Sequence, residues 1–518
     1  MEQSFFLHPV IERNVHKKIT GLKIKKASGP DSISNKIIKY SADDFVIPLT
    51  KIYNAVLTSA VYPTRWKMAE VIALHKKGCL HDPNNYRPVS LLDCFGKILE
   101  KLVYDQMMSF IKKHSILFIF QYGFRKGHSS TLALIDIVDN IKSHLDKNHF
   151  GIGIFLDIRK AFDTVTHSIL FQKLEHYGFR GHSLILLKSY MTGRTQYCKV
   201  NNRKSKTSTI SYGVPQGSVL GPLLFLLYVN DIQNCVDKEK IKLFADDTGV
   251  FIFGPDLEIL IRESSTNLSL LYQWFLKNNL ALSLEKTHFI LFHGKRKKIP
   301  NNITELRFGN FSIPRVKSTK YIGLILDETL SWREHVEGVL KSVHKFFGVF
   351  YNMRDFINTN LIRIIYFSCV FSHIKYGIEI YGNCNSSLMQ KLQVTQNKLL
   401  RVLSKKDYRY SSEDLHKDLN LFKISKFRDF FILQFVHKCI RGHTILPFKD
   451  YFKLAREHHD HNTRNINQIA RNRINTENGR TTTHYHGATL WNHLPEHLTS
   501  IVSPSGFKTA LKTHYKNI

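Results

Sequence analysis

Two adjacent carboxylates, Asp246 and Asp247, stand in a short polar stretch between two apolar runs. The whole segment, 241–253, reads IKLFADDTGVFIF, and this pattern predicts a β-hairpin with the two acidic residues at its tip. Neighbouring acidic groups repel each other, and a divalent cation between them relieves the repulsion. The tip is therefore a candidate metal site.

A third carboxylate, Asp157, follows the apolar run 152–156, which is expected to be a strand. A charge at the end of a buried strand is costly unless it faces solvent or a cation. If Asp157 and Asp246 lie on neighbouring strands, they can bridge two Mg²⁺ ions, as in enzymes of phosphoryl transfer. The alternative is that Asp157 only caps a following helix, and this residue alone does not decide between the two.

The composition indicates a folded protein with a polyanionic partner. The chain has 518 residues, of which 43% are hydrophobic, and 74 Lys and Arg against 42 Asp and Glu give a formal charge of +32. Nucleic acid is the first candidate partner, with a membrane surface or plain solubility as alternatives.

The longest apolar run, Val219–Val229, is too short to span a bilayer, and the first residues do not resemble a signal peptide. Seven scattered cysteines without a Cys-x-x-Cys pair favour a reducing compartment, so we expect no membrane association and no secretion.

The elements that must position the carboxylates form an expected α+β core. From about Val71 to Phe253, short strand-like runs such as 71–74 and 241–245 alternate with helical patterns such as 129–145. Beyond Trp332 apolar residues recur at helical spacing, which predicts a helical domain. The residues of this pattern are Val336, Leu340, Val343, Phe347 and Phe350, and then Leu388, Leu392, Thr395, Leu399 and Val402.

Two further polar stretches have several interpretations. The run His458-His459-Asp460-His461 contains metal-binding residue types, but no ligands with metal-site spacing flank it, so an exposed polar loop is favoured. The basic run 294–298, GKRKK, is typical of a nucleic-acid contact, a nuclear address or a solvated loop.

Three motifs occur in a fixed order along the chain: FLDIRKAFD at 155–163, GVPQGSVLGP at 213–222 and FADD at 244–247. This combination closely resembles the reverse transcriptases of non-long-terminal-repeat retrotransposons, especially the jockey-like and related lineages. The resemblance covers nearly the whole chain, and the further matching stretches are 28–31, 85–92, 121–129, 284–287, 321–324 and 490–495.

The resemblance implies an α+β right-hand polymerase. Residues 1–50 would be an N-terminal extension with a finger-associated motif, and 51–328 the fingers and a palm with an antiparallel sheet. Residues 329–405 would be the helical thumb, and 406–518 a basic helical or irregular region of unassigned role, with RNA binding and a folded cap on the thumb as the two alternatives. The implied enzyme extends a primer 3′-hydroxyl with dNTPs on an RNA template, using two Mg²⁺ ions for which Mn²⁺ can substitute. Its partners would be template RNA, a DNA primer or target DNA and dNTPs, in a nuclear or cytoplasmic ribonucleoprotein.

The resemblance also assigns the acidic residues. Asp157, Asp246 and Asp247 would be the catalytic triad and the metal ligands, with Asp247 in a supporting or transient role. Phe162 stands where these enzymes place a ring beneath the incoming sugar, which would exclude a 2′-hydroxyl. Taken alone, Phe162 is better explained by core packing.

Further residues are implied to bind the nucleotide. Gln216 and Gly217 lie in a Gly/Pro-rich turn, whose small residues let a nucleotide approach the backbone. Arg87 and Arg125 resemble finger residues that contact triphosphate or template, and arginine suits phosphate oxygens. Lys286 resembles a lysine proposed as general acid for pyrophosphate, and the strand-like run 321–326 resembles the primer grip. Lys76 or Lys77 is implied to assist the arginines. Solvated surface is the alternative for Arg125, for Lys286 and for these two lysines.

Elements of this kind generally also encode an apurinic-like endonuclease, and no room for one precedes Gly29. We therefore expect that endonuclease activity must come from elsewhere. The alternative function is a catalytically silent RNA-binding remnant of a truncated element. A group II intron maturase is a third interpretation, which the tail at 490–495 disfavours.

Overall fold

The computed structural model describes the chain except residues 1–2, 201–202, 301, 456–467, 472 and 518. The chain divides into two compact units. The first comprises Met1–Phe118, Ile158–Asp237 and Leu270–Ser283, and the second comprises Ile119–Asp157, Lys238–Ser269 and Leu284–Ile518. The four-residue run at 458–461 lies outside the described residues.

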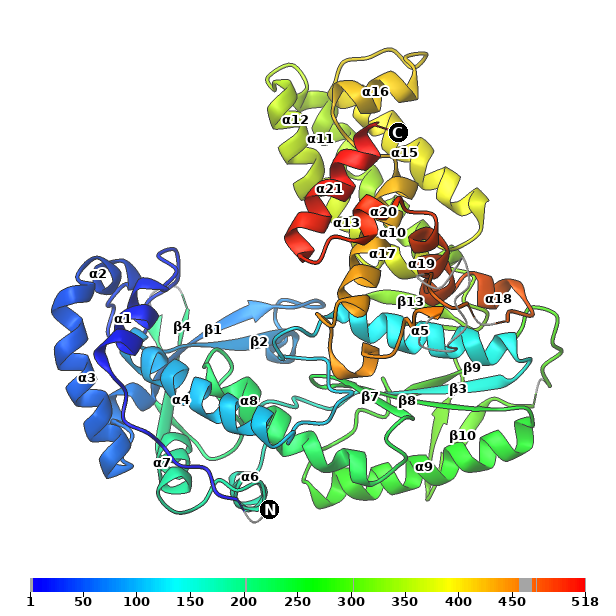
Figure 1. Ribbon diagram of the computed structural model, residues 1–518. Coiled ribbons are helices and arrows are strands. Elements are labelled where there is room, and N and C mark those ends of the chain that lie inside the picture. The colour runs from blue at the N-terminus through cyan, green and yellow to red at the C-terminus, as the bar shows by residue number, and fades with distance from the viewer. Residues whose placement is uncertain (1–2, 201–202, 301, 456–467, 472, 518) are drawn as a thin grey trace. The chain divides into compact units, whose positions relative to one another are not determined.

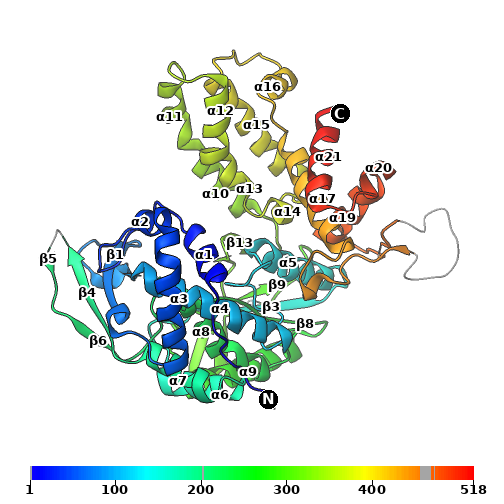
Figure 2. The ribbon, with the colours of Figure 1, turned by 60° about the vertical axis from the view of Figure 1, so that its left-hand side comes forward.

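The first unit joins a mixed sheet to a set of helices. The strand order is β2-β1-β4-β5, with β6 on β4; β1 pairs antiparallel with β2 and parallel with β4. Helix α1 packs against α3 and α4 (Figure 2). The strands are β1 (Met68–His75), β2 (Tyr86–Leu91), β4 (Arg194–Val200), β5 (Arg203–Lys204) and β6 (Ser208–Ile210), and the helices are α1 (Glu12–Thr20), α2 (Asn35–Tyr40), α3 (Ala42–Ser59), α4 (Cys94–Lys113), α6 (His167–His176), α7 (Gly181–Met191) and α8 (Leu220–Val229).

The SGPD stretch at 28–31 is explained by a close approach within this unit. A Cβ on Gly29 would lie 2.4 Å from Oδ1 of Asp93, so only glycine fits there. The N–H of Asp31 donates to the same carboxylate at 3.2 Å. Burial, the largest cause, raises the pKa of Asp93 to about 6. This stretch is therefore an anchor for the start of α4.

The second unit contains a four-stranded antiparallel sheet in the order β7-β8-β3-β9. Its strands are β3 (Phe150–Leu156), β7 (Ile241–Phe244), β8 (Asp247–Gly254) and β9 (His288–Phe292). Helix α5 (Ser130–Asp146) packs on it, and Ser129 caps the helix by accepting from the N–H of Leu132 (Figure 1). The expected hairpin, the strand at 152–156 and the helix at 129–145 are thus confirmed. Helix α9 (Leu257–Lys277) connects β8 to the segment before β9.

One predicted strand is wrong. The run 321–326 is a tight hairpin, in which Tyr321 ends β12 (Ser318–Tyr321) and Leu324 begins β13 (Leu324–Asp327). Ile322 and Gly323 form the turn with φ of 43° and 85°, the left-handed values that a two-residue hairpin requires. The apolar pattern did not reveal this reversal because the turn itself contains an apolar residue. A second hairpin joins β10 (Glu305–Phe308) to β11 (Phe311–Pro314).

The rest of the second unit is helical, which confirms the periodicity from Val336 onward. Helix α17 packs against α15, α19 and α21 (Figures 1 and 2). A continuous core of buried apolar side chains extends from α5 and the sheet through β12 and β13 to α21. The helices are α10 (Arg333–His344), α11 (Phe346–Met353), α12 (Thr359–Ile365), α13 (Ser372–Lys375), α14 (Ile378–Tyr381), α15 (Ser386–Leu403), α16 (Ser412–Asp418), α17 (Ile424–Ile440), α18 (Glu477–Arg480), α19 (Thr483–Asn492), α20 (Glu496–Thr499) and α21 (Pro504–Asn517).

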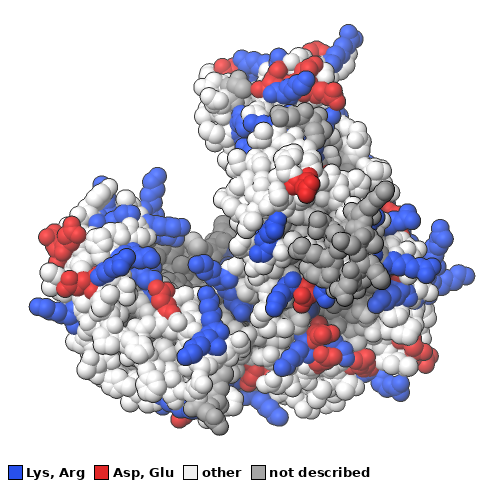
Figure 3. Space-filling model, viewed as in Figure 1, with Lys and Arg blue, Asp and Glu red and all other residues white. Residues whose placement is uncertain are grey.

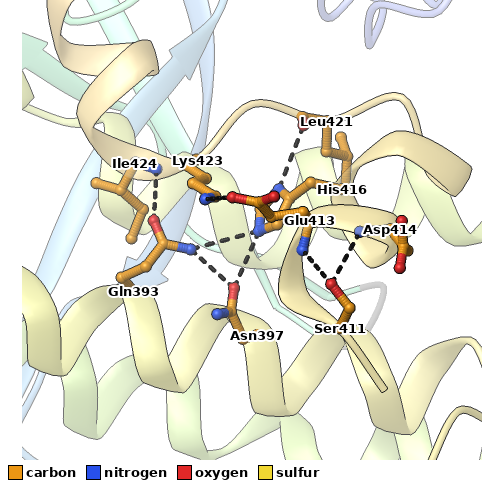
Figure 4. Close-up of polar contacts among 9 residues, drawn as sticks. All are labelled: Gln393, Asn397, Ser411, Glu413, Asp414, His416, Leu421, Lys423 and Ile424. Atoms are coloured by element: carbon orange, nitrogen blue, oxygen red, sulfur yellow. Dashed lines mark hydrogen bonds and ion pairs between the residues drawn. The ribbon is translucent and has the colours of Figure 1, made fainter.

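A polar network ties α15, α16 and the start of α17 together (Figure 4). The N–H of Ile424 donates to Oε1 of Gln393 at 2.8 Å, and the same side chain donates to Asn397 at 2.8 Å. Nε2 of the buried His416 lies 2.9 Å from the Asn397 amide oxygen. The Gln393 side chain of α15 thus accepts a hydrogen bond from the first N–H group of α17. The region beyond residue 405 is therefore folded onto the helices before it.

The last helices are also attached to α5, by two carboxylates on one face of that helix. Asp139 accepts from the N–H groups of Thr483 and His484 at 2.9 and 2.8 Å, and also from the Tyr451 hydroxyl. Asp146 accepts from the N–H groups of Asn475 and Thr476, the latter at 2.6 Å. Asp139 therefore caps α19 from another part of the chain, and Asp146 holds the two residues that lead into α18.

Candidate active site

The tip of the β7–β8 hairpin holds Asp246 and Asp247 on a short, strained turn. Phe244 pairs with Asp247, so the turn consists of Ala245 and Asp246 alone. Ala245 has φ of 58°, the left-handed region that costs a non-glycine residue about 1–2 kcal/mol. Both aspartate side chains are exposed. The local pairing therefore presents two carboxylates to solvent at one fixed point.

The sheet register brings Asp157 to the same edge. Leu156 pairs with Thr248, and one further step in this antiparallel register sets Asp157 opposite Asp247. The next helix, α6, begins only at His167, so the alternative that Asp157 caps a following helix is wrong. All three predicted carboxylates belong to the second unit and follow or begin neighbouring strands.

Asp157 already contacts a cation. Nζ of Lys286 lies 3.2 Å from its Oδ2, with 61% of the lysine side chain and 40% of the aspartate side chain exposed. The backbone N–H of Asp157 donates to the Thr287 hydroxyl at 3.4 Å. The motif at 284–287 thus lies against the predicted site. An ion pair this exposed is easily exchanged for another cation.

A buried tyrosine lies behind the aspartates. Tyr321, at the end of β12, is 5% exposed, and a Cβ on Gly249 would lie 2.8 Å from its hydroxyl. Burial and then the charge of Asp247 raise the pKa of Tyr321 well above its ordinary value of 10.0. Tyr321 therefore stays a neutral phenol beside the acidic edge.

The donor set suits a hard divalent cation. Three carboxylates at one sheet edge offer only oxygen ligands, which Mg²⁺ prefers, and one of them already binds an ammonium group. Within the described residues, no three His, Cys, Asp or Glu side chains are clustered tightly enough to enclose a metal ion. The residues fit an open site of the kind in which Mg²⁺ keeps waters and substrate phosphates as further ligands.

The first unit holds the rest of the 155–163 motif, from Ile158 onward, beside the 213–222 motif. The Nε2 of Gln216 donates to Oδ1 of Asp163 at 2.8 Å, while the N–H of Val214 donates to the carbonyl of Phe162 at 2.8 Å. Burial, as the largest cause, raises the pKa of Asp163. The ring of Phe162 stacks on that of Phe225 with centroids 4.5 Å apart, so it has the packing contact that the alternative interpretation predicts.

The loop before α8 is held by contacts with β2 and α4. Gly217 has φ of 122°, and a Cβ there would lie 2.4 Å from the carbonyl oxygen of Ser90. The N–H of Ser90 donates to the carbonyl of Gln216 at 2.7 Å. Buried Glu100 accepts from the N–H of Val219 and of Leu220 at the start of the helix. Glycine is therefore required at 217 by the close approach of β2.

The predicted basic residues have different environments. Arg87 is exposed on β2, and Lys76 and Lys77 are exposed in the turn after β1. Arg125, in the second unit, is half-buried and donates from Nη1 to the carbonyl of Gln121 at 3.2 Å. Burial lowers the pKa of Arg125 below its ordinary value.

Sequence reasoning missed a buried polar cluster beneath the hairpin. Lys242 on β7 is 3% exposed and pairs with Asp136 of α5 at 2.8 Å, and the Tyr122 hydroxyl donates to the same oxygen at 2.8 Å. The ammonium also lies 3.3 Å from the ring centroid of Phe120. The signal was present in the sequence: a lysine inside a short apolar strand needs a buried partner.

The stretch of chain that contains the three carboxylates is similar to a known protein family. Residues 74–326 match the family model described as reverse transcriptase (RNA-dependent DNA polymerase), and this range contains all three carboxylates. This stretch of the chain is therefore similar to a reverse transcriptase domain. The resemblance to reverse transcriptases of non-long-terminal-repeat retrotransposons is confirmed.

Relatives extend the likeness beyond the reverse transcriptase domain. The chain is 27% identical to the probable RNA-directed DNA polymerase from transposon BS of Drosophila melanogaster, over 86% of this chain and 50% of the relative. It is 28% identical to the RNA-directed DNA polymerase from mobile element jockey of the same species, over 82% and 47%. It is 29% identical to the probable polymerase from transposon X-element, over 76% and 44%.

The chain thus spans about half the length of these relatives. Among the described residues, none of the helices combines the length and the apolar character needed to cross a bilayer.

Proposed function

We propose that this protein is an RNA-directed DNA polymerase that extends a primer 3′-hydroxyl with dNTPs on an RNA template. The observation that carries the proposal is the convergence of Asp157, Asp246 and Asp247 on one sheet edge within a reverse transcriptase domain. Folding alone does not call for adjacent, exposed acids on a strained turn. The excess of basic residues suits a nucleic-acid template, and Lys and Arg side chains spread over the face in Figure 3.

In this proposal Asp157 and Asp246 are the main metal ligands and Asp247 supports them. Two Mg²⁺ ions bound there, or Mn²⁺ in their place, would activate the primer hydroxyl and neutralise charge on the triphosphate and the departing pyrophosphate. The protein supplies the fixed spacing of the carboxylates, which the β3–β8 register and the two-residue turn determine. Lys286 holds the Asp157 carboxylate and would protonate pyrophosphate as it leaves.

The motifs of the first unit would bind the nucleotide. Phe162 is supported from one side by the ring of Phe225, which gives it a rigid position from which to exclude a 2′-hydroxyl. Gln216 is oriented by Asp163, and the exposed Gly217 follows it in the loop. Arg87 of this unit and Arg125 of the second unit would contact triphosphate or template.

The architecture follows from these roles. We propose that the four-stranded sheet is the palm, the mixed sheet the fingers, the hairpin β12–β13 the primer grip and α10 to α15 the thumb. RNA template, DNA primer or target DNA and dNTPs would be the partners, in a nuclear or cytoplasmic ribonucleoprotein. Nicking of target DNA would come from an activity other than this site.

Primer extension tests the proposal. The purified chain, with Mg²⁺ and dTTP, is expected to lengthen oligo(dT) on poly(rA), and D157A and D246A are expected to abolish this. D450A is the matched control, since Asp450 is another exposed aspartate of the second unit. If the parent retains the hybrid but makes no product, the catalytically silent RNA-binding remnant is the correct function. If D157A and D246A extend primers like the parent, the site assignment is wrong.

A further inference from the structure

The segment 120–123 runs alongside β7 and ends against the turn that carries Asp246. Gln121 forms a parallel bridge with Leu243, the N–H of Tyr122 donates to the carbonyl of Leu243 at 2.8 Å, and the N–H of Leu243 donates to Phe120 at 3.0 Å. The hairpin edge is thus paired as far as the last residues before its tip. Pairing of this kind restrains the strand but does not by itself fix the turn.

The side chain of Gln121 continues the restraint into the turn. Its Oε1 accepts from the N–H of Ala245 at 3.0 Å and from the N–H of Gly123 at 2.8 Å, and the residue is 2% exposed. Its Nε2 is buried and has no hydrogen-bond partner within the described part of the chain. A single acceptor therefore satisfies two backbone N–H groups, one on each side of the contact.

The backbone of Ala245 lies so close to Gly123 that no side chain fits at position 123. A Cβ on Gly123 would lie 2.3 Å from the nitrogen and 2.9 Å from Cα of Ala245. Ala245 is the residue with φ of 58°, so its conformation persists only where surrounding groups hold it. Gln121 and Gly123 supply that hold, directly beside the peptide that carries Asp246.

We propose that Gln121 is a positioning residue, which fixes the Ala245 peptide and thereby the directions in which Asp246 and Asp247 present their carboxylates. The inference rests on the proposed polymerase site and extends it to a residue remote from the reacting atoms. Without the Gln121 acceptor, the N–H groups of Ala245 and Gly123 would be buried and unsatisfied. The turn would relax from its left-handed conformation and the two carboxylates would lose their common direction.

Three variants test this role: Q121L removes the acceptor, Q121E restores an acceptor oxygen in the same shape, and Y122F removes a neighbouring buried hydrogen bond away from the turn. Mn²⁺ binding to the intact chain, followed by electron paramagnetic resonance, reports the carboxylates without polymerisation. We expect Q121L to bind Mn²⁺ about tenfold or more weakly, Q121E to recover most of the loss, and Y122F to bind like the parent. D246A provides the reference for a broken site.

Primer extension on the same proteins gives the second readout. Q121L should lower kcat and raise the Mg²⁺ concentration for half-maximal rate, with little change in KM for dTTP, since Arg125 contacts the backbone carbonyl of Gln121, which the substitution retains. A Q121L protein with parental Mn²⁺ affinity overturns the inference, whether or not the parent polymerises. A parent that binds Mn²⁺ but makes no product would instead overturn the polymerase function, while a weakened Q121L would still support the positioning role.

Discussion

Two groups of aspartates in the second unit differ in their environments. Asp157, Asp246 and Asp247 lie at the sheet edge, two of them exposed and the third half-exposed beside Lys286. Asp139 and Asp146 on α5 are 5% and 8% exposed, and backbone N–H groups and hydroxyls surround them. A carboxylate whose oxygens are occupied by protein donors stabilises the fold, whereas one that faces solvent on a rigid turn is available to a cation.

The largest expected effect concerns the exposed group. D157A should reduce primer extension by about 10³-fold, or about 4 kcal/mol in the barrier, because the carboxylate proposed as a main metal ligand is lost. Its free energy of unfolding should stay within about 0.5 kcal/mol of the parent, since only an exposed ion pair disappears. Parallel assays of extension and denaturant unfolding measure both. A large loss of stability would show that Asp157 is part of the framework, like the α5 aspartates.

D139A should give the opposite result. Removing this carboxylate leaves the N–H groups of Thr483 and His484 and the Tyr451 hydroxyl without their acceptor. We expect a loss of about 3 kcal/mol in the free energy of unfolding. Extension per folded molecule should remain close to that of the parent. Protection of α19 amides from hydrogen exchange should fall, and unchanged protection would contradict the anchoring role.

Lys142, between the two buried aspartates on α5, predicts a pH dependence. Burial lowers its pKa to about 8 from 10.5, although its Nζ donates to the carbonyl of Thr481 at 2.8 Å. Between these values the unfolded chain binds more protons, so the parent should gain stability relative to K142M as pH rises from about 8 to about 10.5. Denaturant titrations of both proteins across this range measure the difference. A difference that does not change with pH would contradict the prediction.

The smallest expected effect is on the exposed pair itself. K286A should change the free energy of unfolding by less than about 1 kcal/mol, because the ion pair with Asp157 is solvent-screened. If Lys286 protonates pyrophosphate, kcat should fall while Mn²⁺ affinity at the carboxylates is retained or rises. K295A, an exposed lysine of the basic run 294–298, is the control. Equal effects of the two variants would exclude a specific role for Lys286.

Local patterns predicted the elements nearest to the chemistry. The hairpin at 241–253, the strand before Asp157 and the helix that Ser129 caps all have the expected positions. The run 321–326 misled because Ile322 is an apolar residue in a turn. The site roles of the three aspartates, of Phe162, Gln216, Gly217 and Lys286, and of Arg87 and Arg125 stay predictions, as do the domain boundaries at 50, 328 and 405.

The sequence by itself determined the chemistry of this protein: the acidic pair between two strand-forming runs, the order of the motifs and the excess of basic residues. Only the tertiary structure decided what holds the acidic pair in place and what the last helices attach to. Gln121 reaches Ala245 across more than a hundred residues, and Asp139 of α5 caps α19 more than three hundred residues later. Hydrophobic periodicity reports which face of an element is buried, but not which distant donor meets a buried acceptor there.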